Sequence, residues 1–247
     1  MNKKLFHLYE VGGHVRDGIL GLKSKDVDYV AVPSDELLEK FTEASDMFQV
    51  LDEYLTNENF EIFLKTPDCF TIRAKFPESH KYEGVADFVM ARKEIGYIPN
   101  TRTPIVKPGT LYDDLERRDC CLNALAKDYD GTIIDYFDGL ADLKNGILRT
   151  PLDPKITIND DPLRICRYIR FSITKGFTIS NDLKFEMINY DYENKMHVVS
   201  EERIMEELKK CFKHNTLKTL IILNEFPGLR NYIFTKTNLW LKPTSEK

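Results

Sequence analysis

Short apolar runs separated by turn residues dominate the first half of the chain, which predicts a small sheet with short helices between its strands. Residues 26–32 (DVDYVAV) alternate polar and apolar side chains, as a strand with one buried face does. Gly12 and Gly13 mark a turn between a strand and a short helix. We expect strands at 5–9, 26–32, 69–76 and 85–90 and a helix at 15–20.

The segment 92–110 interrupts this pattern, because glycine and proline recur throughout it. These residues are Gly96, Pro99, Pro104, Pro108 and Gly109. Their spacing predicts a long mobile loop, and a loop of that length inside a compact domain is more often functional than idle.

From about residue 113 onward, apolar residues recur every three or four positions, which is the period of amphipathic helices. Ser200 precedes one such pattern and suits its N-cap. Helices are expected at 113–127, 161–174, 181–190, 200–213 and 216–224, with one strand-like stretch at 132–136. Strands followed by helices predict two segregated units and an α+β fold.

Composition places the chain among soluble globular proteins, with 42% hydrophobic and 30% charged residues in 247. The longest aliphatic run, 220–223, is too short to span a bilayer, and the N-terminus lacks a signal-peptide pattern. Five cysteines without a Cys-x-x-Cys pair argue against a disulfide scaffold and a zinc site. We therefore expect no membrane association and a cytoplasmic location.

Charge is distributed unevenly along the chain. The net charge is −5, but residues 208–247 carry eight Lys or Arg and two Glu. Such a basic end on an acidic body is a candidate phosphate-contacting surface. A solvated helical face is the plainer interpretation of the charges alone. The candidate RNA-contacting lysines are Lys209, Lys210, Lys213 and Lys218.

A first group of candidate functional residues lies in VGGHVRD (11–17) and DVD (26–28). Gly12 and Gly13 allow the backbone to approach a ligand, and Arg16 follows one helical turn later. Asp26 and Asp28 are two residues apart on a predicted strand, so both carboxylates leave the same face. Paired carboxylates suit Mg²⁺ when that ion also binds substrate phosphates.

Two further groups lie on predicted helices. In ERRDCCLN (116–123), Arg118, Asp119 and Asn123 fall within about one turn. In DDPLRICR (160–167), polar residues recur every three positions, and an Asp beside an Arg can imitate the pairing edge of a base. These residues are Asp161, Arg164 and Arg167. The alternatives are an exposed, salt-bridged helix end for the former and an intrahelical ion pair for the latter.

These motifs, in this order, resemble the class II tRNA nucleotidyltransferases (CCA-adding enzymes) and the related bacterial poly(A) polymerases. The resemblance covers about residues 5–213 and includes the stretch 131–149 and the helix-like SEERIMEEL (200–208). It implies a nucleotidyltransferase palm with a small mixed sheet at 1–140. An all-helical neck and a truncated body at 141–247 would follow, because family members usually continue further.

The resemblance also implies roles for the candidate residues. Asp26 and Asp28 would bind the catalytic Mg²⁺ ions, and Asp87 would supply the third catalytic carboxylate. Residues of the first two groups would hold the triphosphate and the ribose: Gly12, Gly13, Arg16, Arg118, Asp119 and Asn123. Asp161 and Arg164 would serve as the template that pairs with CTP or ATP, with Arg167 beside them. The segment 92–110 would be the loop linked to switching from C to A addition.

The implied activity is addition of C and/or A from CTP and ATP to the 3′ end of tRNA, with the basic segment holding the acceptor stem. Two alternatives are an oligo- or poly(A) polymerase and a non-catalytic RNA- or nucleotide-binding derivative of the family. His14 stands where a small residue is frequent, and Cys120-Cys121 stand where an apolar residue and Thr are usual. The sequence sets no oligomeric state.

Overall fold

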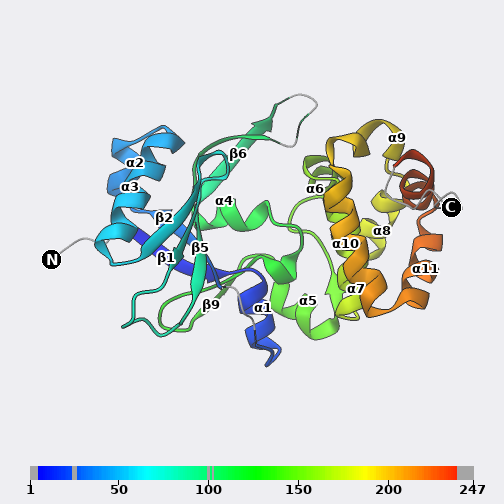
Figure 1. The fold of residues 1–247 in the computed structure, drawn as a ribbon, viewed down its shortest axis with the longest axis horizontal. Helices are drawn as coiled ribbons and strands as arrows, with labels where there is room; N and C mark the ends of the chain where they lie inside the picture. Colours follow the sequence, from blue (N-terminus) through cyan, green and yellow to red (C-terminus); the bar gives the residue numbers. More distant parts are fainter. Residues whose placement is uncertain (1–4, 24–26, 99–100, 102, 238–247) are drawn as a thin grey trace, which may run out of the picture. The chain divides into compact units, whose positions relative to one another are not determined.

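The computed structural model describes residues 5–23, 27–98, 101 and 103–237. The chain folds into two compact units, one comprising residues 1–96 and 104–141 and the other residues 97–103 and 142–247. The first unit holds a mixed sheet with helices, whereas the second is mostly helical (Figure 1). The α+β architecture, with a sheet followed by helices, is therefore confirmed. The assignment of 1–140 as a palm and 141–247 as a neck and partial body stays a prediction.

A seven-stranded sheet forms the centre of the first unit, in the order β3-β4-β5-β2-β1-β8-β9. Its strands are β1 (Phe6–Val11), β2 (Val27–Pro33), β3 (Glu61–Thr66), β4 (Thr71–Lys75), β5 (Val85–Met90), β8 (Leu125–Lys127) and β9 (Ile133–Asp135). β2 and β5 run parallel, and the other neighbours run antiparallel. The strands expected around residues 5–9, 27–32, 69–76, 85–90 and 132–136 are confirmed; residue 26 lies outside the described residues.

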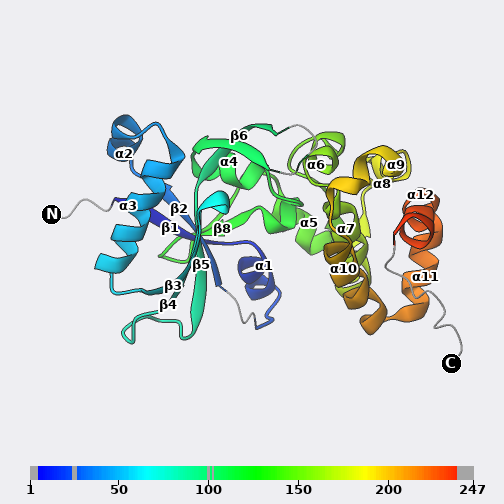
Figure 2. The same cartoon turned by 45° about the horizontal axis from the view of Figure 1, so that its top comes forward.

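The alternation along β2 sends its side chains to two different cores. Val27, Tyr29 and Ala31 pack in a cluster with the helix α3 (Ala44–Asn57), to which α2 (Asp35–Lys40) also contributes (Figure 2). Val30 packs on the other face, in a cluster with α4 (Leu111–Glu116). The period of two in a strand is the physical cause of this division.

Helix α3 was not anticipated from the sequence, although its apolar residues have helical spacing. Met47, Leu51 and Leu55 recur every four positions and are fully buried against the sheet. Ser34 caps the preceding helix, because its hydroxyl accepts a hydrogen bond from the Leu37 backbone N–H. These two helices cover one face of the sheet.

The second unit consists of short and medium helices. They are α6 (Pro154–Asp160), α7 (Leu163–Thr174), α8 (Asn181–Ile188), α9 (Tyr192–Lys195), α10 (Glu201–His214), α11 (Thr216–Glu225) and α12 (Pro227–Asn231), with a π-helical turn at Tyr232–Lys236. A short parallel pair, β10 (Ile147–Leu148) with β11 (Thr178–Ile179), completes the unit. α7 packs against α10 (Figure 2). No helix in the described part of the chain is long and apolar enough to cross a membrane.

Two sequence predictions are wrong. The helix expected at 113–127 ends at Glu116, and a 3₁₀ turn (Cys121–Asn123) and strand β8 follow. Residues 120–122 are all fully buried, and one face of an amphipathic helix cannot bury three consecutive side chains.

The loop expected at 92–110 instead contains β6 (Arg92–Tyr97) paired with β7 (Pro104–Pro108). Proline is tolerated there because β7 is an edge strand.

Helix α5 (Gly139–Asn145) begins where the chain passes very close to another segment of the first unit. A Cβ atom built on Gly139 would lie 2.2 Å from the carbonyl oxygen of Cys121. Backbone is the obstacle here, so a side chain at this position requires a shift of one segment.

We expect Gly139→Ala to lower the free energy of unfolding by about 2 kcal/mol, the typical cost of overpacking. Gly18→Ala is the matched control, because a Cβ at Gly18 in α1 (Gly13–Ile19) meets no atom within 4 Å. The control should be neutral or stabilising by up to about 1 kcal/mol, since Ala favours a helix more than Gly does. Urea unfolding followed by circular dichroism measures the free energy of unfolding of both variants. Equal values for Gly139→Ala and Gly18→Ala would contradict the close approach of Gly139 to the Cys121 carbonyl.

Candidate functional site

Two aspartates face one another on the parallel strands β2 and β5. Asp28 and Asp87 are register partners, so their side chains leave the same face of the sheet on strands about 4.8 Å apart. Both are partly buried. Asp26, the other carboxylate predicted for this site, lies outside the described residues. The structure thus brings together two of the three predicted carboxylates from segments far apart in the sequence.

Arg73 on β4 binds the carboxylate of Asp87 through two parallel hydrogen bonds. Its Nε and Nη2 atoms donate to Oδ1 and Oδ2, each at 2.6 Å. The two residues are register partners on β4 and β5, and with Asp28 they line a small surface hollow. Sequence reasoning missed Arg73, although its alternation with the buried Ile72 and Ala74 already puts it on the polar face of a strand. Any cation that binds Asp87 must compete with this guanidinium.

The Gly12–Gly13 turn lies beside these aspartates. Gly12 has φ +70°, and a Cβ there would lie 3.1 Å from Nη1 of Arg118 and 3.8 Å from Oδ2 of Asp28. The positive φ therefore favours glycine, and the close guanidinium leaves little room for a side chain. The turn, Arg118 and Asp28 consequently share one small region.

A chain of buried hydrogen bonds connects α1 to the turn after α4. Arg16 Nη1 donates to Oδ1 of Asn123 at 2.6 Å, and Asn123 Nδ2 donates to Oδ1 of Asp119 at 2.9 Å. All three side chains are buried. Sequence reasoning expected Asp119 and Asn123 to meet on a helix; they meet instead through the 3₁₀ turn at Cys121–Asn123.

The carboxylate of Asp114 orients the guanidinium of Arg118. This fully buried carboxylate accepts from Arg118 Nη2 at 2.9 Å and from Arg117 Nη2 at 2.5 Å. Burial opposes its ionisation, but the two guanidinium groups outweigh that cost and hold the pKa of Asp114 at about 2. Asp114 was not among the predicted residues, although its position four residues before Arg118 indicates such a pair.

In the second unit, the predicted stripe lies along α7. Asp161, Arg164 and Arg167 are half-buried, while the positions between them are buried. Asp161 Oδ1 accepts from the backbone N–H of Leu163, the first residue of α7, at 3.0 Å, and Arg164 Nη1 donates to the Thr157 carbonyl at 3.1 Å. Arg170 continues the stripe and donates to Glu207. That this stripe meets a nucleotide bound by the first unit stays a prediction.

The predicted RNA-contacting lysines differ in their surroundings. Lys209, Lys210 and Lys213 are exposed on α10. Lys210 lies 3.4 Å from Glu207, and the Nζ of Lys218 donates to the Ser172 carbonyl at 3.0 Å. Lys218 is therefore less available to a phosphate than the first three.

Asp28 and Asp87 have the donor chemistry that magnesium requires. Both present hard carboxylate oxygens from adjacent strands, and Mg²⁺ usually takes one or two carboxylates together with water and phosphate oxygens. No group of three His, Cys, Asp or Glu side chains in metal-binding range occurs within the described ranges, from which Asp26 is missing. The residues present fit a magnesium ion shared with a phosphate ligand.

Comparison with known proteins gives consistent matches. Residues 8–149 match the family model of the poly A polymerase head domain. The chain is 36% identical over 239 residues to the mitochondrial CCA tRNA nucleotidyltransferase of Saccharomyces cerevisiae, covering 90% of this chain and 41% of that protein. It is 28% identical over 245 residues to the CCA-adding enzyme of Staphylococcus saprophyticus, covering 95% and 55%. The chain thus spans about half the length of these relatives.

Solved structures agree in fold. A tRNA nucleotidyltransferase complexed with a primer tRNA and an incoming ATP analog superposes with a TM-score of 0.68 at 26% identity, covering 96% of this chain and 61% of that one. The Thermotoga maritima CCA-adding enzyme complexed with tRNA gives 0.68 at 27% identity, covering 96% and 50%. A tRNA-processing enzyme with CTP gives 0.65 at 26% identity, covering 91% and 54%.

We expect the Asp114 carboxylate to contribute pH-dependent stability. Its pKa is about 2 in the folded protein against an ordinary 3.8, so the contribution is present above pH 4 and is lost as the pH falls toward 2. Asp114→Asn should lower the free energy of unfolding by about 3 kcal/mol at neutral pH, because two arginines lose their buried partner.

The difference between Asp114→Asn and the wild type should narrow between about pH 4 and pH 2. Glu39→Gln, at an exposed position of α2, should change stability by less than about 0.5 kcal/mol. Urea unfolding at several pH values measures both variants. A difference that stays constant across this pH range would contradict the assignment.

Proposed function

The chain belongs to the poly A polymerase head domain family, and from this membership we propose that it adds C and/or A residues from CTP and ATP to the 3′ end of tRNA. Its similarity to proteins named CCA tRNA nucleotidyltransferase and CCA-adding enzyme supports this choice. Related solved structures in complex with tRNA, an ATP analog and CTP support the same substrates. A cytoplasmic location stays a prediction.

One observation carries the proposal: Asp28 and Asp87 pair in register beside Gly12 and Arg118. Carboxylates next to a guanidinium and an open backbone turn form a site for a cation together with a polyphosphate. A protein that only binds RNA through basic residues has no need of paired carboxylates at that place.

Asp26, Asp28 and Asp87 would hold Mg²⁺, which when bound lowers the pKa of the RNA 3′-hydroxyl and stabilises charge on the α-phosphate. Arg118 would donate to phosphate oxygens, with its guanidinium oriented by Asp114. Gly12 would allow those oxygens to approach the backbone. Arg73 would release Asp87 as the site fills, because both groups compete for the same oxygens.

The buried chain Arg16–Asn123–Asp119 would position the ribose side of the site. Arg16 is 5% exposed and is already bonded to Asn123 and to Asp17, so its contribution would be to hold that turn. Asp119 and Asn123 would form the ribose side of the site.

Base selection would belong to α7. Arg164 would donate to O2 and N3 of cytosine while Asp161 accepts from the exocyclic amine, with Arg167 beside them. A wrong base would leave these polar groups unpaired at about 1–3 kcal/mol each. Lys209, Lys210 and Lys213 would contact the phosphates of the tRNA acceptor stem.

We expect Asp28→Asn and Asp87→Asn to reduce nucleotide incorporation at least about 100-fold, because each removes charge from the magnesium site. Asp68→Asn, an exposed carboxylate before β4, is the control and should retain activity. The assay supplies Mg²⁺ and single nucleoside triphosphates to tRNAs that end before, within or after CCA, and the products are sequenced.

Restoration of CCA or part of it would support the proposal. Long A tracts on unrelated RNAs would identify a poly(A) polymerase instead. A wild-type protein that is inert with every RNA and metal tried, yet binds nucleotides, would identify a non-catalytic derivative.

We expect Arg164→Ala to lower kcat/KM for CTP about 10- to 100-fold and to narrow the preference for CTP over UTP, since one donor pair is lost. Arg203→Ala on α10, which is exposed, is the matched control and should preserve the preference. Single-nucleotide incorporation with competing CTP and UTP measures the ratio. An unchanged CTP/UTP ratio in Arg164→Ala would contradict a protein-side-chain template.

A further inference from the structure

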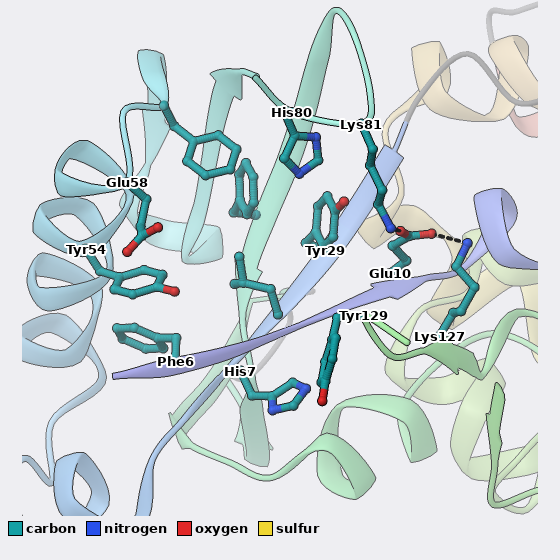
Figure 3. A pocket seen from close by; sticks show the side chains of 13 residues that line it. Phe6, His7, Glu10, Tyr29, Tyr54, Glu58, His80, Lys81, Lys127 and Tyr129 are labelled. Carbon is teal, nitrogen blue, oxygen red and sulfur yellow. Dashed lines mark ion pairs between the residues drawn. The ribbon is translucent and has the colours of Figure 1, made fainter. Parts of the chain in front are cut away.

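A cavity of about 250 Å³ opens on one face of the sheet (Figure 3), whereas Asp28 and Asp87 leave the other face. Tyr29 and Phe88 line the cavity, and each follows one of the two aspartates along its strand. Neighbouring residues of a strand point to opposite faces, so this cavity is separated from the paired aspartates by the sheet itself. It lies wholly within the first unit.

The interior of the cavity is lined by aromatic rings. Tyr29 stacks on Phe88 with ring centroids 5.1 Å apart and planes 7° from parallel. Phe60 meets the edge of Phe88 at 4.9 Å, and Phe6 lies 5.5 Å from Tyr54. Flat apolar walls of this kind favour a planar ring as ligand.

One border of the cavity carries a surplus of positive charge. The carboxylate of Glu10, 2% exposed, accepts hydrogen bonds from Lys127 at 2.5 Å, from Lys81 at 2.7 Å and from the Tyr82 hydroxyl at 3.0 Å (Figure 3). Two ammonium groups thus share one carboxylate, and the side chain of Lys81 remains 52% exposed. An anionic group on the ligand would balance the remaining charge.

The border of the cavity on the side of α3 carries negative charge instead. Glu58 lines the cavity next to Tyr54 and ends α3, where the helix dipole adds partial negative charge. Two histidines also line the cavity: His7, which is bonded to Asp128 at 2.8 Å, and His80, which stacks on Phe76. A hydrogen-bond donor on the ligand, such as an exocyclic amine, would suit Glu58.

From these three features we propose that the cavity binds one nucleoside monophosphate unit, with its base against the aromatic lining. The base would donate its exocyclic amine to Glu58, and the phosphate would accept from Lys81 and Lys127. The volume is just below the range of about 300–1,000 Å³ for small-molecule sites, which suits a single unit better than a dinucleotide. The unit comes from a free mononucleotide or from one nucleotide of a single-stranded RNA.

Binding of AMP to the full chain in EDTA tests this site by titration calorimetry, because chelation removes the divalent ion that the catalytic face requires. AMP should bind more tightly than UMP, which lacks an exocyclic amine, and ribose 5-phosphate should bind least. Lys81→Ala should weaken AMP binding about tenfold, the effect of one charge-assisted hydrogen bond. Lys40→Ala, an exposed lysine outside the cavity, should leave it unchanged.

Leu8→Phe fills the cavity and should abolish AMP binding while nucleotide incorporation persists. Glu58→Ala should reduce the preference for AMP over UMP. Asp28→Asn should retain AMP binding, whatever its effect on catalysis. The proposal is overturned if Leu8→Phe and Lys81→Ala bind AMP like the wild type, or if Asp28→Asn alone loses binding.

A comparison of AMP with oligo(A) distinguishes the two sources of the nucleotide. Binding of oligo(A) at least ten times tighter than that of AMP, and lost in Leu8→Phe, indicates an RNA strand. Binding of AMP with no gain for oligo(A) indicates a free mononucleotide. Failure of AMP, UMP and oligo(A) to bind the wild type overturns the site without bearing on incorporation of CTP or ATP.

Discussion

The in-register parallel pairing of β2 with β5 is the constraint on which the first unit depends. It opposes Asp28 to Asp87 on one face and Tyr29 to Phe88 on the other. A slip of one residue would send the carboxylates into the aromatic core and the rings to the polar face. Burial of Tyr29 and Phe88 therefore stabilises the same register that brings the two carboxylates together.

Two buried carboxylates organise the charged groups around this sheet in the same way. Asp114 accepts from Arg117 and Arg118, and Glu10 accepts from Lys81 and Lys127. In each case burial opposes ionisation, but the neighbouring cations outweigh it and lower the pKa of the carboxyl group. The carboxylates thus hold cations in defined positions near Asp28 on one face of the sheet and at the border of the cavity on the other.

The part of the chain that matches the family model also contains the residues of the candidate site in the first unit. The family model covers residues 8–149, which include the paired aspartates, the glycine turn and the Arg118 region. The second unit contributes the α7 stripe, whose half-buried arginines alternate with residues packed in the helical core. Under the proposed function, the first unit would supply phosphate binding and the second would supply base selection.

Periodicity in the sequence determined the elements whose burial is local and regular. The alternation at 27–32 and the three-residue repeat of Asp161, Arg164 and Arg167 both describe faces that exist in the structure. The glycine turn was also recognisable, because few residues other than glycine adopt its positive φ. Between 113 and 127 the helical period misled, since buried residues there contact the sheet from a turn and a strand rather than from one helix face.

Only the tertiary structure decided which charged groups share a site. Arg73 meets Asp87 across a strand pair, and Glu10 meets Lys81 and Lys127 from three separate segments. Such contacts depend on strand order and register, which no local pattern encodes. The sequence by itself determined the polar and apolar faces and the family motifs, whereas the assembled sheet decided their partners, because hydrogen bonds between strands join residues far apart along the chain.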